Sequence, residues 1–183
     1  MPHSDPDSRS HSASLIELES FLPYRLSVLS NVVSDAIALA YRNRYGLSIP
    51  EWRVVAVLAR HPGISAAEVG ALTRMDAVTV SRAVSRLLRA GRVRRRVSRE
   101  DRRRSVLRLS AAGGAVYRAV APLALRFEAE LLDGLDATER GRLDVLLRTL
   151  FDKARKLAAR GAATGPAKAA TGRHRTARRR PAR

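Results

Sequence analysis

The sequence contains no cysteine and few aromatic residues. The first shortage excludes several kinds of site, and the second limits the composition of the core. Without cysteine there are no disulfide bonds, no cysteine zinc sites and no thiol redox sensor, a composition that suits a reducing cytosol. Aromatic residues make up 4% of the chain, whereas hydrophobic residues make up 45%. We therefore expect a folded domain whose core is built mainly from Leu, Val and Ala.

Long apolar runs are also missing. No stretch approaches the ~20 apolar residues that cross a membrane as a helix. Residues 1–14 are polar and include Pro2 and Pro6, so they lack the apolar segment of a secretion signal. These absences predict a cytoplasmic protein without membrane contact, with 1–14 as a disordered lead.

Acidic residues are scarce in two particular stretches. Residues 76–110 hold twelve arginines against three acids, and residues 160–183 hold eight basic residues and no acid, whereas 1–75 and 111–159 are nearly neutral. A G+C-rich genome would spread arginine evenly, so the neutral stretches argue against that explanation of the net charge of +18. The pattern predicts a polyanionic partner, with nucleic acid first and an anionic membrane surface second.

The parts of a catalytic or metal site are absent from the sequence. It has no Gly-rich phosphate loop, and its serines lack a plausible histidine partner, so we interpret them as helix caps and surface residues. The four histidines are scattered along the chain: His3, His11, His61 and His174. We expect no enzyme activity, no metal site and no cofactor.

Helical spacing of apolar residues begins at Leu15 and continues to about Arg44. Pro23 either starts this helix or kinks it, and Gly46 ends it. Three short helices should follow, opened by Ser48, Ser65 and Asp76 as N-caps. Glu51 and Glu68, three residues after the serines, complete two capping boxes. The expected inward residues of these helices are Trp52, Val55, Leu58, Val69, Leu72, Val80 and Leu87.

Two alternating segments, Arg92–Val97 and Arg104–Leu109, predict a β-hairpin after the third short helix. Its expected buried face holds Val93, Val97, Leu107 and Leu109. Ser110 should cap a long helix that Pro122 bends, and Asp136 with Glu139 should open the last helix. Residues 159–183 have no period and predict a basic disordered tail.

This order of elements predicts a mainly α protein with a small β-hairpin, a winged helix-turn-helix that binds double-stranded DNA. The helix after Asp76 should enter the major groove, because short polar and Arg side chains on its exposed face can reach base edges. The arginine-rich hairpin suits the minor groove. The candidate DNA-binding residues are Thr79, Ser81, Arg82, Ser85 and Arg86 on the helix, and Arg95, Arg99, Asp101, Arg102 and Arg103 on the hairpin. For each arginine the alternatives are a phosphate contact and a solvated charge.

The stretch Leu47–Gly113 resembles the multiple antibiotic resistance regulator (MarR) family. The matching residues are Thr79, Val80, Ser81 and Arg82 on the helix and Gly91, Val93, Arg95, Asp101, Arg103, Leu107, Leu109, Ser110 and Gly113 after it. Arg92 departs from the pattern, because an apolar residue is common at this position, and Ser110 replaces the usual threonine.

The resemblance implies a MarR-type domain over 15–158, with the winged helix-turn-helix at about 47–110 and dimerisation helices at about 15–45 and 111–158. It also implies that Asp101 pairs with Arg103 at the tip of the hairpin. The expected protein is a homodimer that represses transcription at a pseudo-palindromic operator and is relieved by a signal.

The effectors of the family are often small aromatic or other anionic compounds. Tyr24, Arg25 and Tyr41 are the candidate ligand-binding residues. The alternative function is a non-specific architectural nucleic-acid-binding protein, which the basic tail would also suit.

Overall fold

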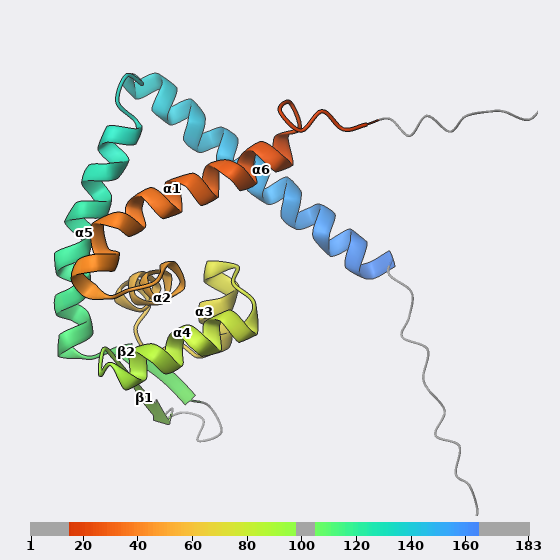
Figure 1. Ribbon diagram of the computed structural model, residues 1–183. Helices are drawn as coiled ribbons and strands as arrows, with labels where there is room; N and C mark the ends of the chain where they lie inside the picture. Colours follow the sequence, from red (N-terminus) through yellow and green to blue (C-terminus); the bar gives the residue numbers. More distant parts are fainter. Residues whose placement is uncertain (1–14, 98–104, 165–183) are drawn as a thin grey trace, which may run out of the picture. The chain divides into compact units, whose positions relative to one another are not determined.

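The computed structural model describes residues 15–97 and 105–164, which form helices and one two-stranded sheet (Figure 1). The elements are α1 (Leu22–Tyr45), α2 (Ile49–Arg60), α3 (Ala66–Thr73), α4 (Ala77–Arg89), β1 (Val93–Val97), β2 (Ser105–Leu109), α5 (Ala111–Leu131) and α6 (Ala137–Thr164). They confirm the mainly α fold with a small hairpin. The chain divides into two compact units, one ending at Leu131 and one beginning at Leu132.

Local hydrogen bonds place the helix starts where the sequence predicts them. Ser48 accepts a bond from the Glu51 N–H at 3.4 Å, and the Glu51 carboxylate accepts one from the Ser48 N–H at 2.7 Å. The same reciprocal pair forms between Ser65 and Glu68 before α3. Each pair satisfies N–H groups that the first turn of a helix leaves without partners.

The first helix begins at Leu22, with Pro23 in its first turn, so proline starts the helix rather than kinking it. A proline is tolerated there because the first-turn N–H groups have no acceptor within the helix. The apolar residues from Leu15 to Phe21 therefore precede α1 and form no helix of their own. Gly46 ends α1 in the left-handed conformation, with φ of 58°.

The core of the first unit is aliphatic. Its fully buried side chains come from α1, α2, α3, α4, the hairpin and α5, and the largest are Tyr41, Leu47, Val54, Val55, Leu58, Val69, Val80, Val84, Leu87, Leu107 and Val120. Trp52 is half-buried and lies between two tyrosines, with ring centroids 5.6 Å from Tyr41 and 6.0 Å from Tyr117. This aromatic stack joins α1, α2 and α5.

Two expected core residues are exposed, and those predictions are wrong. Leu72 on α3 is 53% exposed because the helix is only eight residues long and the core takes Val69 instead. Val97 is 61% exposed, although it shares a strand face with Val93, which is 2% exposed. The hairpin therefore packs on the core only at its base, and its outer end lies beyond the core.

The hairpin is antiparallel, with Val93 paired to Leu109 and Val97 paired to Ser105. Ile64, in the connection between α2 and α3, adds a bridge on the other edge of β2 through Leu107. Ser110 donates its hydroxyl to the Gly91 carbonyl at 2.6 Å and accepts the Gly113 N–H at 3.1 Å. One side chain thus caps α5 and holds it to the start of the hairpin.

The second unit contains α6, opened by Asp136 and Glu139 in the predicted capping box. The helix continues to Thr164, six residues past the expected end at 158. The extension consists of Ala159, Arg160, Gly161, Ala162, Ala163 and Thr164. Alanine and arginine are good helix formers, and they outweigh the single glycine, whereas loss of apolar periodicity had indicated disorder.

Candidate DNA-binding interface

The helix α4 has two faces of opposite character. Val80, Ala83, Val84 and Leu87 are buried in the core of the first unit. On the other face the predicted base-reading residues are exposed: Ser81, Arg82, Ser85 and Arg86. Because the buried face fixes the rotation of the helix about its axis, the two serines and two arginines are presented together to solvent.

The start of α4 is held by Asp76 and Thr79. The Asp76 carboxylate accepts the Thr79 N–H at 2.8 Å and the Thr79 hydroxyl at 2.6 Å. These bonds, the hydroxyl bond first, lower the pKa of the Asp76 carboxyl. The hydroxyl proton of Thr79 is therefore engaged in the cap, and only its oxygen lone pairs remain for an outside donor.

A tight connection sets α3 against α4. Arg74 adopts the left-handed conformation, with φ of 57°, and ends α3. The Thr73 hydroxyl donates to the Val69 carbonyl at 2.7 Å, which satisfies an acceptor in the last turn of α3. Gly70 packs closely on this connection, and an added Cβ would lie 3.4 Å from the Met75 carbonyl oxygen, at ordinary contact distance. This is the turn of the predicted helix-turn-helix.

Arg95 lies on the hairpin face that looks toward α4. It lines a hollow of about 460 Å³ together with Ser81 and Val84. Small residues of α3, Met75 of the turn and two further residues of α4 form the rest of the wall. A smaller hollow of about 230 Å³ brings Arg82 and Arg86 beside the start of α2 at Ser48. The structure thus brings Arg95 beside Ser81 of α4, whereas Arg82 and Arg86 line a separate hollow.

The other predicted hairpin residues, Arg99, Asp101, Arg102 and Arg103, lie outside the described residues. Their segment joins two strand ends that are paired at Val97 and Ser105. The expected Asp101–Arg103 pairing stays a prediction.

Comparisons with known proteins agree on one family. Residues 45–104 match the sequence pattern of the MarR family. The HTH-type transcriptional regulator BilQ of Clostridium symbiosum is 29% identical over 105 residues, which cover 57% of this chain and 73% of BilQ. Over these residues the chain is similar to MarR-family transcriptional regulators.

Solved structures of MarR-family regulators share its fold. A MarR/EmrR family regulator from Acinetobacter sp. ADP1 superposes with a TM-score of 0.72 at 24% identity, over 77% of this chain and 99% of that one. PcaV from Streptomyces coelicolor, solved with its natural ligand, gives a TM-score of 0.63 at 26% identity over the same shares.

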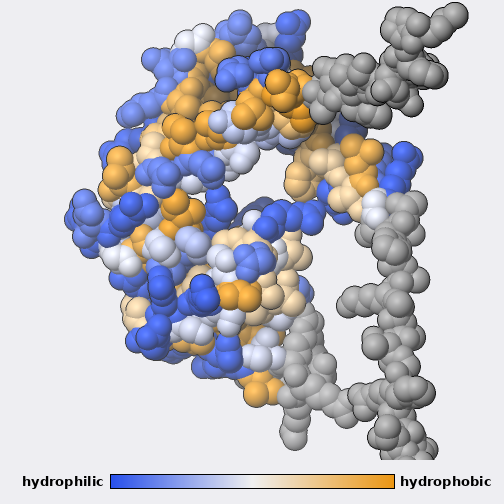
Figure 2. Space-filling view, turned by 45° about the vertical axis from the view of Figure 1, so that its right-hand side comes forward, coloured by the Kyte–Doolittle hydropathy of each residue, from blue (hydrophilic) through white to orange (hydrophobic). Residues whose placement is uncertain are grey.

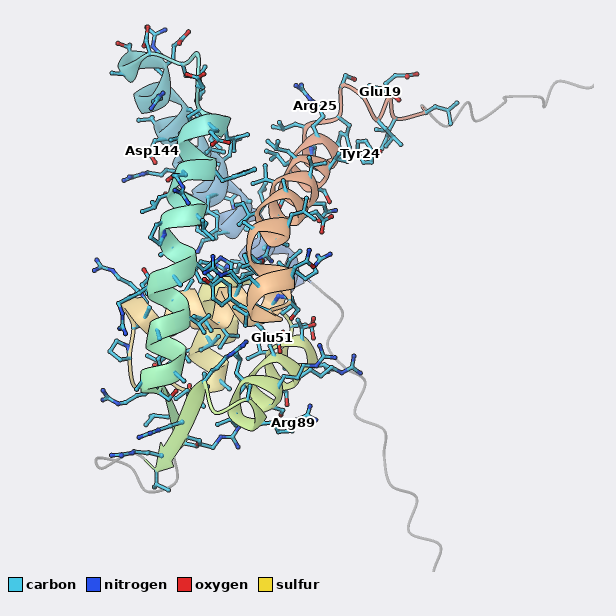
Figure 3. The ribbon with its side chains drawn as sticks, turned by 60° about the vertical axis from the view of Figure 1, so that its left-hand side comes forward. Glu19, Tyr24, Arg25, Glu51, Arg89 and Asp144 are labelled. Carbon is cyan, nitrogen blue, oxygen red and sulfur yellow. The ribbon has the colours of Figure 1, made fainter. Side chains whose placement is uncertain are left out.

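The three candidate ligand-binding residues do not meet in the structure. Tyr24 and Arg25 are exposed near the start of α1, at the end away from Glu51 and Arg89 in the DNA-binding part (Figure 3). Tyr41 is 1% exposed and stacks on Trp52 near the other end of the helix. Burial raises the pKa of the Tyr41 hydroxyl. A single pocket made of all three would need seventeen residues of helix, about 25 Å, to be spanned by one small molecule.

Arg92, the departure from the family pattern, has a structural partner that the sequence did not reveal. Its guanidinium is half-buried and donates to the Tyr45 carbonyl at 2.6 Å, at the C-terminal end of α1. A cation is favourable there because the last carbonyls of a helix lack partners and carry partial negative charge. The bond ties α1 to the turn between α4 and β1.

Two features are absent from the part of the chain that the structure describes. No helix there is long and apolar enough to cross a membrane. No group of three or more histidine or acidic side chains there could hold a metal ion.

Proposed function

We propose that two copies of this chain bind a pseudo-palindromic operator as a dimer and repress transcription by covering a promoter. Each copy would place α4 in the major groove of one half-site and the hairpin in the neighbouring minor groove. The observation that carries the proposal is the divided surface of α4, whose apolar side is locked in the core while Ser81, Arg82, Ser85 and Arg86 face outward. Thr79 would contribute an acceptor only.

The hairpin contributes the second set of contacts in this proposal. Arg95 lies beside the exposed face of α4, and Arg99, Asp101, Arg102 and Arg103 follow it in the sequence toward the tip. Arginine is favoured in narrow minor grooves because of their negative potential. Contacts on both sides of one phosphate backbone would fix the orientation of α4 in the major groove.

Apolar surface on the helices at the two ends of the domain supports the dimer. On α1, Leu22, Leu26, Leu29 and Val32 are each between 38% and 60% exposed. The helix α6 buries none of its described side chains, although it carries leucines at helical spacing. Figure 2 shows hydrophobic side chains reaching the surface along the helices in the upper part of the view. Apolar surface on this scale favours a protein partner, and a second copy would supply it.

The proposed domain boundaries follow from this arrangement. The winged helix-turn-helix would occupy about 47–110, and the dimerisation parts about 15–45 and from 111 to the end of α6. A DNA-binding regulator without enzyme activity would act in the cytoplasm, where bacterial-type repressors meet the chromosome.

Release by a small aromatic or other anionic compound is part of the proposal. PcaV, at 26% identity, was solved with its natural ligand, so at least one similar regulator binds a ligand. A ligand relieves repression only if it binds the DNA-free form more tightly than the DNA-bound form. Screening aromatic acids for thermal stabilisation of the protein, followed by release of bound operator, would identify such a compound.

Selection of binding sites from random DNA tests the central claim. We expect the recovered sites to contain two inverted half-sites with centres about 10 bp apart. The complex should survive an excess of unrelated DNA, and sedimentation should show a dimer at micromolar concentration. An architectural protein would instead recover no common sequence and would be removed by unrelated DNA.

A further inference from the structure

The hairpin carries a second group of arginines on the face turned away from α4. Successive residues of a strand point to opposite faces, so Arg94 and Arg96 lie opposite Arg95. Arg108 pairs directly with Arg94 across the two strands, and Arg96 pairs with Val106. Arg94, Arg96 and Arg108 are all exposed. We call these three residues the outer arginine ladder.

Arg108 is held in place by a glycine in the connection between α2 and α3. Its guanidinium lies against Gly63, where an added Cβ would come within 2.8 Å of Nη2 and 3.1 Å of Cζ. Gly63 adopts a φ of +88° and donates its N–H to the Leu107 carbonyl at 2.8 Å. The connection between α2 and α3 is therefore hydrogen-bonded to β2, and the two form one surface. The outer arginine ladder lies along the edge of this surface.

No acid among the described residues balances the charges of the ladder. Across the described residues, no carboxylate forms an ion pair with any of the three arginines. In the sequence from 77 to 127 the only acids are Glu100 and Asp101, which lie outside the described residues. Like charges directly opposite each other on two strands destabilise a sheet. A bound polyanion would remove this repulsion.

The ladder cannot read the same DNA segment as Arg95. That residue shares a hollow with Ser81 and Val84 of α4, whereas the ladder lies on the opposite face of the strands. If α4 occupies the major groove, the DNA available to the outer face is the duplex that continues past the hairpin. Arginine binds phosphate bidentately and needs no particular base for it.

We propose that the outer arginine ladder binds the phosphate backbone of DNA flanking the operator half-site. This inference rests on the proposed function. It extends the protein footprint beyond the bases that α4 and the hairpin tip read. The ladder adds affinity and salt dependence, and it adds no sequence preference.

Two duplexes test the proposal. The core duplex ends at the edges of the site selected from random DNA, and the extended duplex adds about one helical turn, ~10 bp, of unrelated sequence on each side. Wild-type protein should bind the extended duplex more tightly and with a steeper dependence on salt. In R94Q/R96Q/R108Q this advantage should disappear, with a log–log salt slope about 5 units less steep on the extended duplex, because the dimer loses six arginines and each phosphate contact contributes ~0.9. Binding to the core duplex should change little.

The matched control removes the same charge elsewhere. In R118Q/R126Q/R155Q three exposed arginines of α5 and α6 are replaced, and the advantage of the extended duplex should remain. R94K/R96K/R108K keeps the charge and should also keep most of the advantage. This variant and circular dichroism of all the proteins separate loss of charge from loss of fold.

Each other outcome overturns the proposal. Equal loss on both duplexes would place the ladder on the half-site itself. Unchanged binding to both would mean that this face meets no DNA, and would favour an acidic protein as its partner. Failure of the proposed function is distinguishable, because the wild-type protein would then not separate the selected site from a scrambled one on either duplex.

Discussion

The helices α4 and α6 both carry apolar residues at helical spacing, but only α4 has buried them. Val80, Ala83, Val84 and Leu87 of α4 are at most 3% exposed, whereas Leu146 of α6 is 60% exposed and Leu150 36%. The apolar face of α4 is satisfied within its own chain, which leaves its polar face free to bind DNA. The apolar face of α6 still lacks a neighbour in its own unit. The apolar face of α4 is thus buried within the single chain. The exposed apolar face of α6 predicts that a second copy of the chain covers it.

The largest expected effect comes from overpacking the buried contact between α5 and the start of the hairpin in the first unit. A Cβ at Gly113 would collide with the carbonyl oxygen of Arg92, where α5 crosses the start of the hairpin. One side of this contact is backbone and the other is a helix, so neither side can move far enough to relieve the collision. Gly113→Ala should lower the free energy of unfolding by about 3 kcal/mol, as overpacking does at rigid sites. Urea unfolding at fixed protein concentration measures it.

The control for this prediction lies in α6. Gly141 has no atom within 4 Å of an added Cβ. Gly141→Ala should therefore stabilise the protein by about 0.5–1 kcal/mol, because alanine favours a helix interior. A similar loss for both variants would show that α6 is as tightly packed as the hairpin base.

The second prediction concerns the exposed apolar face of α6, which we expect a second copy of the chain to cover. L146E/L150E introduces two carboxylates on the exposed apolar stripe of α6. Burying them at a dimer interface would be costly, so the dimer dissociation constant should rise at least about 100-fold. Operator affinity should fall with it, because one recognition helix reads few bases.

Sedimentation and operator binding at several protein concentrations check this prediction. Arg155→Glu, a charge change at an exposed position of the same helix, serves as the control and should leave the dimer intact. A dimer of unchanged stability in L146E/L150E would assign the apolar stripe to another partner.

The third prediction separates α4 from the hairpin tip. Arg103→Ala should cost about 1–3 kcal/mol of specific binding, with a larger loss on operators with A·T-rich flanks, since narrow minor grooves hold arginine best. Arg82→Ala should instead alter base preference within the half-site, or weaken all sites if it contacts only phosphate. The Arg82 side chain is exposed on α4, so its removal costs no core contact. Binding to operators with A·T-rich and G·C-rich flanks measures the difference; equal losses would reduce Arg103 to a phosphate contact.

The smallest effect concerns the residues after α6. Residues 165–183 contain seven basic residues and no acid, and cutting at 165 keeps α6 whole. The truncated protein should bind all DNA more weakly, with a shallower salt slope and the same preference for operator over random DNA. Loss of that preference would mean that these residues read sequence.

Several features could be predicted from the sequence because the interactions behind them are local. The capping boxes at Ser48 and Ser65 join residues three apart, and the amphipathic pattern of α4 depends on helical spacing alone. The exposed residues Ser81 and Arg82 follow from that spacing, as does the pairing of the hairpin strands from their alternation.

Other features depend on contacts between distant parts of the chain. Arg92 reaches the Tyr45 carbonyl, 47 residues earlier, and no periodicity links the two. Tyr41 turns into the aromatic stack, away from the solvent-exposed Tyr24, because α2 and α5 cover only the later part of α1. Val97 fits the alternation of a buried strand face, but the core ends before it. Spacing specifies which residues share a face, whereas the extent of the neighbouring elements decides how much of that face is covered.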